Sequence, residues 1–265
     1  MSADRLILLC ALAGACRHAP PPLRLGTTYT VEQSGALAIV DSLWRGAPLA
    51  KVIGPSEQIL RTASEGDLDL VIVHAPALEA KWLGGGRAAL RCPLVASRFA
   101  IVGPASDPAG VAGAATAADA MARIAGRRAP FVSRGDSSGT HMKELSLWQA
   151  ARVSPSGEGW YVESGTSQAA TLQIADERGA YALADLPTLA RVQGISLRVL
   201  FAADTTLLNP YTLYIVRQSP EHPAARAFAT WALEIWRDRL AAIRLPDGTA
   251  AFTPRAESCA ATARP

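Results

Sequence analysis

Residues 133–144 read Ser-Arg-Gly-Asp-Ser-Ser-Gly-Thr-His-Met-Lys-Glu, and the rest of the chain is organised around this stretch. Ser137 or Ser138 can cap the helix that the following apolar spacing predicts, because a hydroxyl oxygen accepts a free N–H of the first turn. That turn carries unpaired N–H groups and about half a positive charge. Gly139 lets a ligand approach the backbone closely, and Arg134 adds a fork of donors that stays charged. The stretch therefore predicts half of a binding site for a small oxyanion.

Two other interpretations of this stretch stay open. Ser-Ser-Gly-Thr before a helix is often only a cap, and an arginine in a turn is often only solvated. Gly-Asp-Ser-Ser-Gly at 135–139 is also one residue away from the Gly-Asp-Ser-Gly-Gly of trypsin-like serine proteases. That interpretation needs a histidine and an aspartate upstream on β-barrel strands. The Val-Ile-Val-His-Ala-Pro context of His74 and the helix predicted after Thr140 both disfavour it.

The composition is that of a globular chain without signs of nucleic-acid binding. Its 265 residues suffice for one large or two medium domains, and 49% of them are apolar. The formal net charge of +3 is small and spread along the chain. The sequence has no basic run and no interleaving of aromatic and basic residues, so we expect no nucleic-acid partner.

The first residues predict an export signal. Arg5 precedes an apolar run at 6–13 that is too short to span a bilayer, and small residues follow up to Cys16. Ala-Gly-Ala at 13–15 suits ordinary cleavage, whereas Gly-Ala-Cys resembles the end of a bacterial lipobox and would make Cys16 a lipidated first residue. Residues 1–22 are therefore expected to be a signal peptide and a Pro-rich tether. We expect an exported protein, held at the membrane only if Cys16 is acylated.

Cys92 and Cys259 are the cysteines that remain after such a cleavage. An exported compartment permits a disulfide between them, although the polar, Ala-rich surroundings of Cys259 leave the pairing open. The cysteines are scattered, without a Cys-x-x-Cys motif or histidine partners, so their spacing predicts no metal site.

Strands and helices alternate along the first part of the chain, and polar residues follow each strand. The predicted strands and the polar residues after them are 23–26 with Thr27 and Thr28, 49–53 with Ser56, and 68–73 with His74. This order predicts a doubly wound parallel α/β sheet. Ligands bind outside the carboxyl ends of the strands in such sheets. Each position alone is more often ordinary turn chemistry, and His74 alone is more often a structural hydrogen-bonding group.

The rest of the chain continues the α/β pattern. Further strands are predicted at 97–103, 130–133, 159–163, 179–185, 197–201 and 209–216, and helices at 36–44, 59–64, 77–83, 114–125, 145–151, 168–177, 186–192 and 223–240. The apolar stripe of the helix at 223–240, with Phe228, Trp231, Ile235 and Trp236, indicates core packing. Residues 247–265 are expected to form a loose tail. The two halves are expected to be joined by strands rather than by a linker.

Longer segments carry a resemblance to a known family. They run in order and are Thr27-Thr28, Glu32-x-Ser34-Gly35, Gly66-Asp67-x-Asp69-Leu70-x-x-Val73-His74-Ala75-Pro76, Phe99-x-Ile101-Val102-Gly103-Pro104-x-x-Asp107-Pro108-Ala109-Gly110, Pro130 to Glu144, Trp160-Tyr161, Ala170-Thr171-Leu172, Ala180-Tyr181 and Asn209-Pro210-Tyr211. These segments resemble the tungstate-binding proteins of bacterial ABC transporters. The segment from Arg134 to Thr140 also resembles the anion motif of periplasmic phosphate-binding proteins.

The resemblance implies a type II periplasmic-binding-protein fold, with two α/β lobes joined by crossover strands and the ion in the cleft between them. Lobe one would comprise 23–98 plus 200–265, and lobe two 99–199. The family's binding residues carry over to Thr27, Thr28, Ser56, Arg134, Ser138, Gly139 and Thr140, with Thr166 and Ser167 as weaker candidates. Tyr29 and the Gly-Pro-Ser-Glu-Gln context of Ser56 depart from the family pattern.

The resemblance further implies a solute-binding component of an ABC transporter rather than an enzyme. It would capture tungstate or molybdate without a cofactor, act as a monomer in the periplasm or on the outer face of the membrane, and dock on a membrane permease. Both oxyanions are fully ionised and have four acceptor oxygens, so a selective site should consist of donors only.

Two alternatives to this function remain. Phosphate or sulfate could bind to the same fold, and a phosphate site gains from a buried carboxylate, for which Asp136 and Glu57 are the candidates. A serine hydrolase would instead pair Ser137 or Ser138 with His141 or His74. Ser138 and His141 would lie one helical turn apart, which hinders a nucleophile–base bond with an oxyanion hole beyond it.

Overall fold

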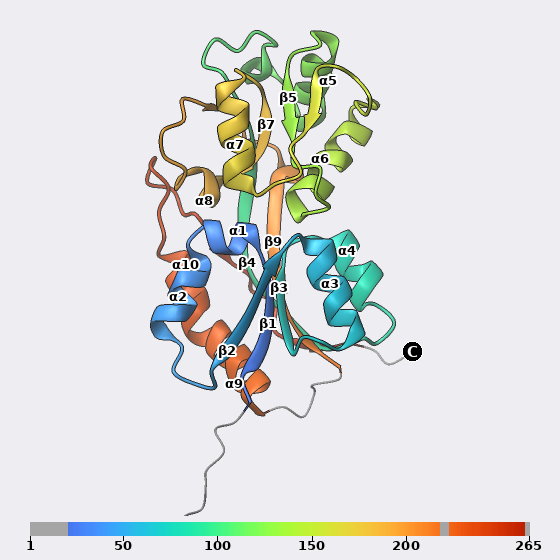
Figure 1. Cartoon of the computed structure of the whole chain (residues 1–265). Coiled ribbons are helices and arrows are strands. Elements are labelled where there is room, and N and C mark those ends of the chain that lie inside the picture. The colour runs from blue at the N-terminus through green and yellow to red at the C-terminus, as the bar shows by residue number, and fades with distance from the viewer. Residues whose placement is uncertain (1–20, 218–222, 263–265) are drawn as a thin grey trace, which may run out of the picture.

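The computed structural model describes residues 21–217 and 223–262, so Cys16 and nearly all of the expected export segment lie outside the described residues. The chain folds into two α/β lobes, one above the other in Figure 1, and long strands run between them. The type II periplasmic-binding-protein architecture that the sequence predicts is therefore confirmed. The described residues include no helix with the length and apolar character needed to cross a membrane.

The lower lobe of Figure 1 is built on one mixed sheet. Its main strands are β1 (Leu23–Thr28), β2 (Leu49–Gly54), β3 (Leu70–Val73), β4 (Ala88–Gly103) and β9 (Leu208–Val216). β1 lies between β2 and β3 and pairs with both in parallel, whereas β9 is antiparallel to β3 and to β4. The predicted parallel pairing is therefore confirmed for the first three strands, and the two long strands make the sheet mixed.

Helices cover both faces of this sheet. They are α1 (Tyr29–Gln33), α2 (Ala36–Leu43), α3 (Ser56–Glu65), α4 (Pro76–Leu83), α9 (Pro223–Trp231) and α10 (Arg237–Ala241), with a π-helical segment at Ala232–Trp236 between the last two. Leu25 packs with α2 and α9 on one face, and Val71 packs with α3 and α4 on the other. α1 is an addition to the predicted elements, and Thr28 begins it by accepting a hydrogen bond from the Val31 N–H at 3.3 Å.

β4 and β9 connect the lobes. β4 pairs with β9 from Ala88 to Arg98 and then continues into the upper lobe, where it pairs with β7 (Ala182–Asp185) and β8 (Arg198–Phe201). β4 starts earlier than the predicted strand at 97–103, and its pairing with β9 is irregular next to Pro93. The two crossover strands are therefore present, while the assignment of 23–98 with 200–265 and of 99–199 to separate lobes stays a prediction.

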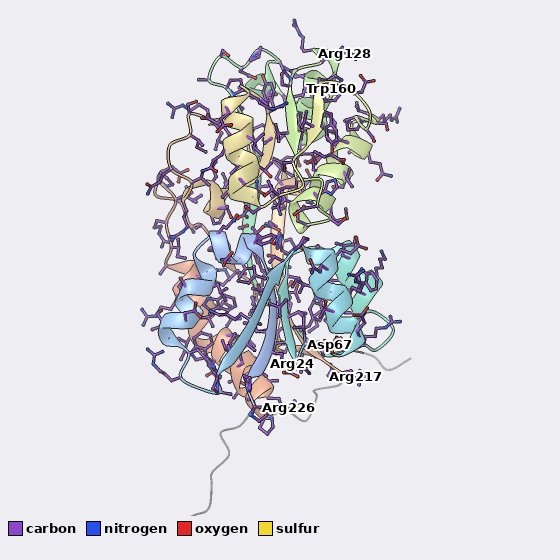
Figure 2. All side chains as sticks on the ribbon, in the orientation of Figure 1. Arg24, Asp67, Arg128, Trp160, Arg217 and Arg226 are labelled. Atoms are coloured by element: carbon purple, nitrogen blue, oxygen red, sulfur yellow. A yellow bond between two sulfur atoms is a disulfide. The ribbon has the colours of Figure 1, made fainter. Side chains whose placement is uncertain are left out.

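The upper lobe is smaller and has its own core. Its remaining elements are α5 (Ala117–Gly126), β5 (Phe131–Ser133), α6 (Gly139–Ala150), β6 (Tyr161–Glu163), α7 (Gln168–Glu177) and α8 (Leu186–Leu189). β5 and β6 pair in parallel. Phe131, Trp148 and Tyr161 pack with aromatic ring centroids 5.1–6.3 Å apart. Figure 2 shows Arg128 and Trp160 at the far end of this lobe, and Arg24 and Asp67 at the opposite end of the molecule.

The expectation of a loose tail at 247–265 is wrong for its described part. β10 (Thr253–Pro254) and β11 (Ala260–Ala261) pair with the free edge of β4, and Phe252 is only 1% exposed. A disulfide joins Cys92 in β4 to Cys259. The composition of this segment did not predict its pairing with β4, because backbone hydrogen bonding at a strand edge requires no apolar side chains.

The prediction that the apolar stripe of the helix at 223–240 packs in the core is correct for most, but not all, of its residues. Phe228 and Trp236 are buried, and the Trp236 indole N–H donates to the Ala36 carbonyl at 3.0 Å. Ile235 is 42% exposed, so its assignment to the core is wrong. The π-helical segment adds a residue to the turn and thereby rotates Ile235 away from the face that a regular helix would give it.

Removal of the disulfide is expected to lower the stability of the lower lobe. The Cys92→Ala/Cys259→Ala variant should have a free energy of unfolding about 2–4 kcal/mol below that of the wild type, because the unfolded chain regains the freedom of a long loop. Urea unfolding measures this difference. A reductant should weaken the wild type and leave the variant unchanged; a wild type that is insensitive to reductant contradicts the prediction.

Candidate functional site

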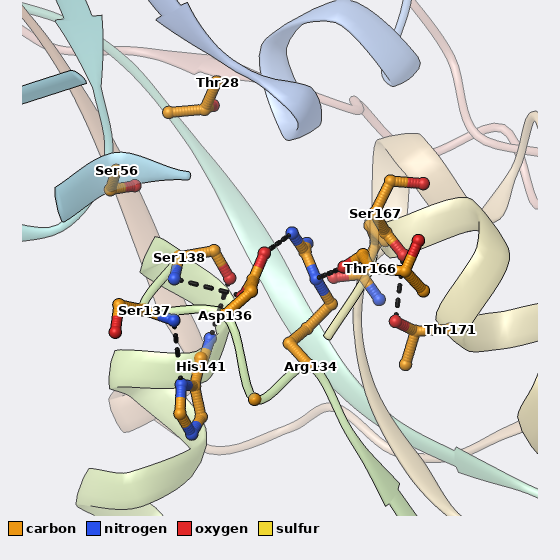
Figure 3. Close-up of polar contacts among 12 residues, drawn as sticks. Thr28, Ser56, Arg134, Asp136, Ser137, Ser138, His141, Thr166, Ser167 and Thr171 are labelled. Atoms are coloured by element: carbon orange, nitrogen blue, oxygen red, sulfur yellow. Dashed lines mark hydrogen bonds and ion pairs between the residues drawn. The ribbon is translucent and has the colours of Figure 1, made fainter. Parts of the chain in front are cut away.

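The residues predicted to bind an oxyanion gather where the two lobes meet. Four helices begin in this region: α1 and α3 from the lower lobe, and α6 and α7 from the upper lobe. Figure 3 shows Thr28 and Ser56 on one side and Ser138, Arg134 and Ser167 on the other. The first N–H groups of a helix have no partner within the helix, so these ends bring donors and partial positive charge together.

Arg134 lies at the centre of the group. Its side chain is 1% exposed, its Nε donates to the Thr166 carbonyl at 2.7 Å, and its Nη2 forms an ion pair with Asp136. The third nitrogen, Nη1, is buried and has no hydrogen-bond partner among the described residues. Burial lowers the pKa of the guanidinium, and the Asp136 carboxylate acts in the opposite direction and supports the charged form. The Arg134 guanidinium is therefore held in a fixed orientation, and its Nη1 can still donate hydrogen bonds to a ligand.

Three hydroxyl groups near Arg134 accept backbone N–H groups. Ser138 Oγ accepts from His141 N–H at 3.3 Å, Thr28 Oγ1 accepts from Val31 N–H at 3.3 Å, and Ser56 Oγ accepts from Gly139 N–H at 3.0 Å. A hydroxyl that accepts one hydrogen bond still has a hydrogen to donate. Thr140 Oγ1 is buried and has no hydrogen-bond partner in the part of the chain that the structure describes. These side chains supply donors to the space beside the guanidinium.

The other predicted residues have structural contacts of their own. Thr27 Oγ1 donates to the Ile72 carbonyl at 3.1 Å, so its only hydrogen is engaged between β1 and β3. Thr166 contributes its carbonyl to Arg134, and Ser167 caps α7 by accepting from the Ala170 N–H at 3.5 Å. Gly139 packs so tightly that an added Cβ would come within 2.6 Å of the His74 ring. The glycine is therefore required for the two lobes to approach each other here.

The two carboxylates that could favour a protonated ligand are both engaged. Asp136 pairs with Arg134 through one oxygen, and its other oxygen accepts from the Ser138 N–H at 3.1 Å. Glu57 forms a salt bridge with Lys81 at 2.7 Å, and this lysine is the main cause that lowers the pKa of the Glu57 carboxyl. Asp136 therefore fixes two donors of the site, Arg134 and the Ser138 turn, whereas Glu57 pairs with Lys81.

The pairing needed for a serine hydrolase is not formed among the described residues. His141 Nδ1 accepts the backbone N–H of Ser137 at 3.1 Å rather than a serine hydroxyl. His74 Nδ1 bonds to Asn209 Oδ1 at 3.0 Å, and burial lowers the pKa of His74 to about 4, so the ring is neutral. His74 thus has the structural role that its position at a strand end indicates.

His74 belongs to a buried polar network at the crossover strands that sequence reasoning missed. The Asn209 amide nitrogen donates to Ser97 Oγ at 3.1 Å and to Asp185 Oδ1 at 3.0 Å, and Ser97 also bonds to Asp185. These residues come from both long strands and from the end of β7. Burial raises the pKa of the Asp185 carboxyl. The network fixes the strands from which both lobes extend.

Glu144 was also missed as a residue of the site. It lies on α6 and is 1% exposed, and its Oε1 accepts from Tyr161 OH at 2.7 Å and from the Trp148 indole N–H at 3.1 Å. Burial raises the pKa of its carboxyl to about 7, although these donors and the Arg134 backbone N–H oppose the shift. One signal in the sequence points to this position, a glutamate one helical turn before the apolar residues Leu147 and Trp148.

Comparison with known proteins places this chain in a family. The profile of the PBP superfamily domain matches residues 25–234. The chain belongs to the PBP superfamily. Within it, the chain is 32% identical over 219 residues to a protein of Peptoclostridium acidaminophilum named tungstate-binding protein TupA, and the match covers 79% of this chain and 76% of the relative. The resemblance to tungstate-binding proteins seen in the sequence is thereby confirmed.

Further relatives of the PBP superfamily agree with this match. A protein of Haloferax volcanii, named a putative ABC transporter anion-binding protein, is 41% identical over 198 residues, which are 71% of this chain and 58% of that protein's length. The solved tungstate-binding protein TupA of Desulfovibrio alaskensis G20 is 33% identical, with a TM-score of 0.70 over 89% of this chain and all of that chain. The solved tungstate ABC transporter protein of Geobacter sulfurreducens is 34% identical, with a TM-score of 0.69 over 82% and 95% of the two chains.

Glu144 should give the protein a measurable pH dependence of stability. Between its unfolded pKa of 4.5 and its folded pKa of about 7, the unfolded state releases a proton that the folded state keeps. The free energy of unfolding should therefore fall as the pH rises through this window, by up to about 3 kcal/mol. Glu144→Gln keeps an oxygen to accept from Tyr161 and should remove this contribution.

Urea unfolding at pH 5 and pH 7 measures the slope in both proteins. Other titrating groups are common to the wild type and the variant, so the difference between the two slopes isolates Glu144. Equal slopes contradict the prediction.

Proposed function

We propose that this PBP-superfamily chain is the extracytoplasmic solute-binding component of an ABC transporter and that it captures tungstate or molybdate between its lobes for delivery to a membrane permease. One observation carries the proposal: Arg134 Nη1 belongs to a buried, ion-paired guanidinium and has no hydrogen-bond partner within residues 21–217 and 223–262. The tungstate-binding names of the relatives from Peptoclostridium and Desulfovibrio support the same ligand.

The chemistry of the donors suits a fully ionised tetrahedral oxyanion. Four acceptor oxygens would meet the free guanidinium nitrogen of Arg134 and the hydroxyl hydrogens of Thr28, Ser56, Ser138 and Thr140. Hydrogen bonds that involve a charged partner contribute roughly 1.5–3 kcal/mol each, so such a set offsets the desolvation of the ion and the cost of lobe closure. The assignment of these residues as ligands is part of the proposal.

Phosphate is the second candidate ligand, and the contacts of the carboxylates make it less favourable. A monoprotonated phosphate needs an acceptor for its proton, whereas Asp136 already accepts from Arg134 and Ser138, and Glu57 pairs with Lys81. A thermal-shift panel with tungstate, molybdate, sulfate and phosphate separates the ligands. Tungstate and molybdate should raise the melting temperature most, and a larger shift with phosphate would overturn the choice of ligand.

We propose that the chain performs no catalysis and acts without a cofactor. Its superfamily consists of substrate-binding domains, and neither histidine near the site bonds to a serine hydroxyl among the described residues. A fluorophosphonate probe tests this point, because covalent labelling of Ser137 or Ser138 would support a hydrolase.

We further propose export and action as a monomer, with lipidation of Cys16 as the only attachment to the membrane. The apolar run at 6–13 supports the export, and the Gly-Ala-Cys sequence supports the lipidation. Mass spectrometry of the protein isolated from its host tests the lipidation, since an acylated Cys16 would be the first residue. An unmodified chain that begins at Cys16 or beyond would contradict the anchor but not the export.

Loss of the guanidinium should abolish most of the affinity. Arg134→Ala removes the charged donor and leaves Asp136 without its partner, so tungstate binding is expected to weaken at least about 100-fold. Isothermal titration calorimetry measures the change. Arg128→Ala is the matched control, because Arg128 pairs with Glu158 at the exposed far end of the upper lobe. An Arg134 variant that binds as tightly as the wild type refutes the site.

Thr140→Val should change stability and affinity in opposite directions. Its buried hydroxyl has no hydrogen-bond partner within the described part of the chain, so the nearly isosteric valine is expected to stabilise the protein in the absence of tungstate by about 1 kcal/mol. The same change removes a donor to the ion and should weaken tungstate binding about five- to tenfold. Urea unfolding and calorimetry give the two quantities. An unchanged affinity would exclude Thr140 from the ligand set.

A further inference from the structure

Among the hydrogen bonds that join the lobes, two are built in the same way. Ser56 Oγ accepts from the Gly139 N–H at 3.0 Å, and Gln33 Oε1 accepts from the Ala169 N–H at 3.0 Å. In both, a side chain of the lower lobe accepts a backbone N–H in the first turn of an upper-lobe helix. That N–H has no partner within its own helix, so the opposite lobe satisfies it.

The Gln33 contact joins two helices that begin at candidate ligand residues. Gln33 is the last residue of α1, which Thr28 caps, and Ala169 is the second residue of α7, which Ser167 caps. α1 lies at the edge of the lower lobe that faces α7 and α8 (Figure 1), and it contacts α7. Gln33 itself is at the far end of its helix from Thr28. It can therefore hold the lobes together without touching an ion beside Arg134.

Arg191 strengthens this junction. A Cβ added to Gly35 would lie 2.9 Å from Arg191 Cζ and Nη1, so the guanidinium rests against the backbone that follows Gln33. Gln33, Ala169, Gln173 and Arg191 line one cavity of about 350 Å³ between the lobes. The junction thus combines a specific hydrogen bond with side-chain packing, and it lies on the opposite side of the site from Ser56 and Gly139.

We propose that Gln33 is a positioning residue that holds the lobes closed around the bound oxyanion. The identity of the ion rests on the proposed function, whereas closure itself does not depend on it. The contact exists only when the lobes are together, so its loss favours opening, and the ion leaves through the open form. Entry of the ion occurs before closure and does not use Gln33. Ser56 also bridges the lobes, but it belongs to the proposed ligand set. A change at Gln33 therefore tests lobe closure separately from direct contact with the ion.

Gln33→Met tests the proposal, because methionine has nearly the length and volume of glutamine but lacks the carbonyl acceptor. Stopped-flow fluorescence should show tungstate dissociating about fivefold faster from the variant, with an association rate no slower than that of the wild type, because the ion enters the open form. Gln33→Asn keeps the amide but shortens it by one CH2 group, and it should behave in the same way. Gln173→Met is the matched control on the same cavity and should release tungstate at the wild-type rate.

Small-angle X-ray scattering of the ligand-free proteins provides a readout that is independent of the ion. The radius of gyration of both Gln33 variants should exceed that of the wild type and of Gln173→Met. If the wild type binds neither tungstate nor molybdate, the proposed function fails. The radii of gyration then test by themselves whether Gln33 holds the lobes closed. A dissociation rate within about twofold of the wild type overturns the role of Gln33 in holding the ion. Equal radii overturn its role in closing the lobes.

Discussion

A buried guanidinium with one unused nitrogen is the constraint on which the rest of the site depends. The Thr166 carbonyl and the Asp136 carboxylate hold two nitrogens of Arg134, which fixes the plane of the group. Nη1 has no hydrogen-bond partner among the residues that the structure describes. Removing an ionic donor from water is costly unless it is paired. Burial of the Arg134 guanidinium has this cost, and a bound anion would offset it by accepting hydrogen bonds from Nη1.

The surrounding elements are arranged to support that point from both lobes. Parallel strands of the lower lobe end together, so Thr28 and Ser56 reach the junction from adjacent strands. The crossover strands carry the upper lobe, and the Asn209 network fixes them at the place where β4 leaves β9. Ser56 and Gln33 then satisfy N–H groups of upper-lobe helices. The same type of donor that would bind an anion therefore also joins the lobes.

Much of this arrangement follows from local patterns in the sequence. Alternating apolar strands and capped helices predicted most elements, and Arg134 with the Ser138 turn predicted the donor side of the site. Local patterns failed where a distant partner determines the structure. The segment around Cys259 is polar and forms short strands only because β4 offers a free edge, and Ile235 is exposed because a π-helical segment shifts the turn. Residue 144 looks like a surface glutamate until Tyr161 and Trp148 surround it.

The amino-acid sequence alone was enough to predict a site rich in hydrogen-bond donors, because hydroxyls, glycine and arginine before a helix donate hydrogen bonds wherever that helix lies. It could not establish which donors are still free, because that depends on atoms far away along the chain. Thr27 is engaged by a carbonyl of β3, Gly139 by Ser56, and Ala169 by Gln33. Such pairings form only when the chain folds, within a lobe for Thr27 and between the lobes for Gly139 and Ala169, since they join groups 45 to 136 residues apart in the sequence.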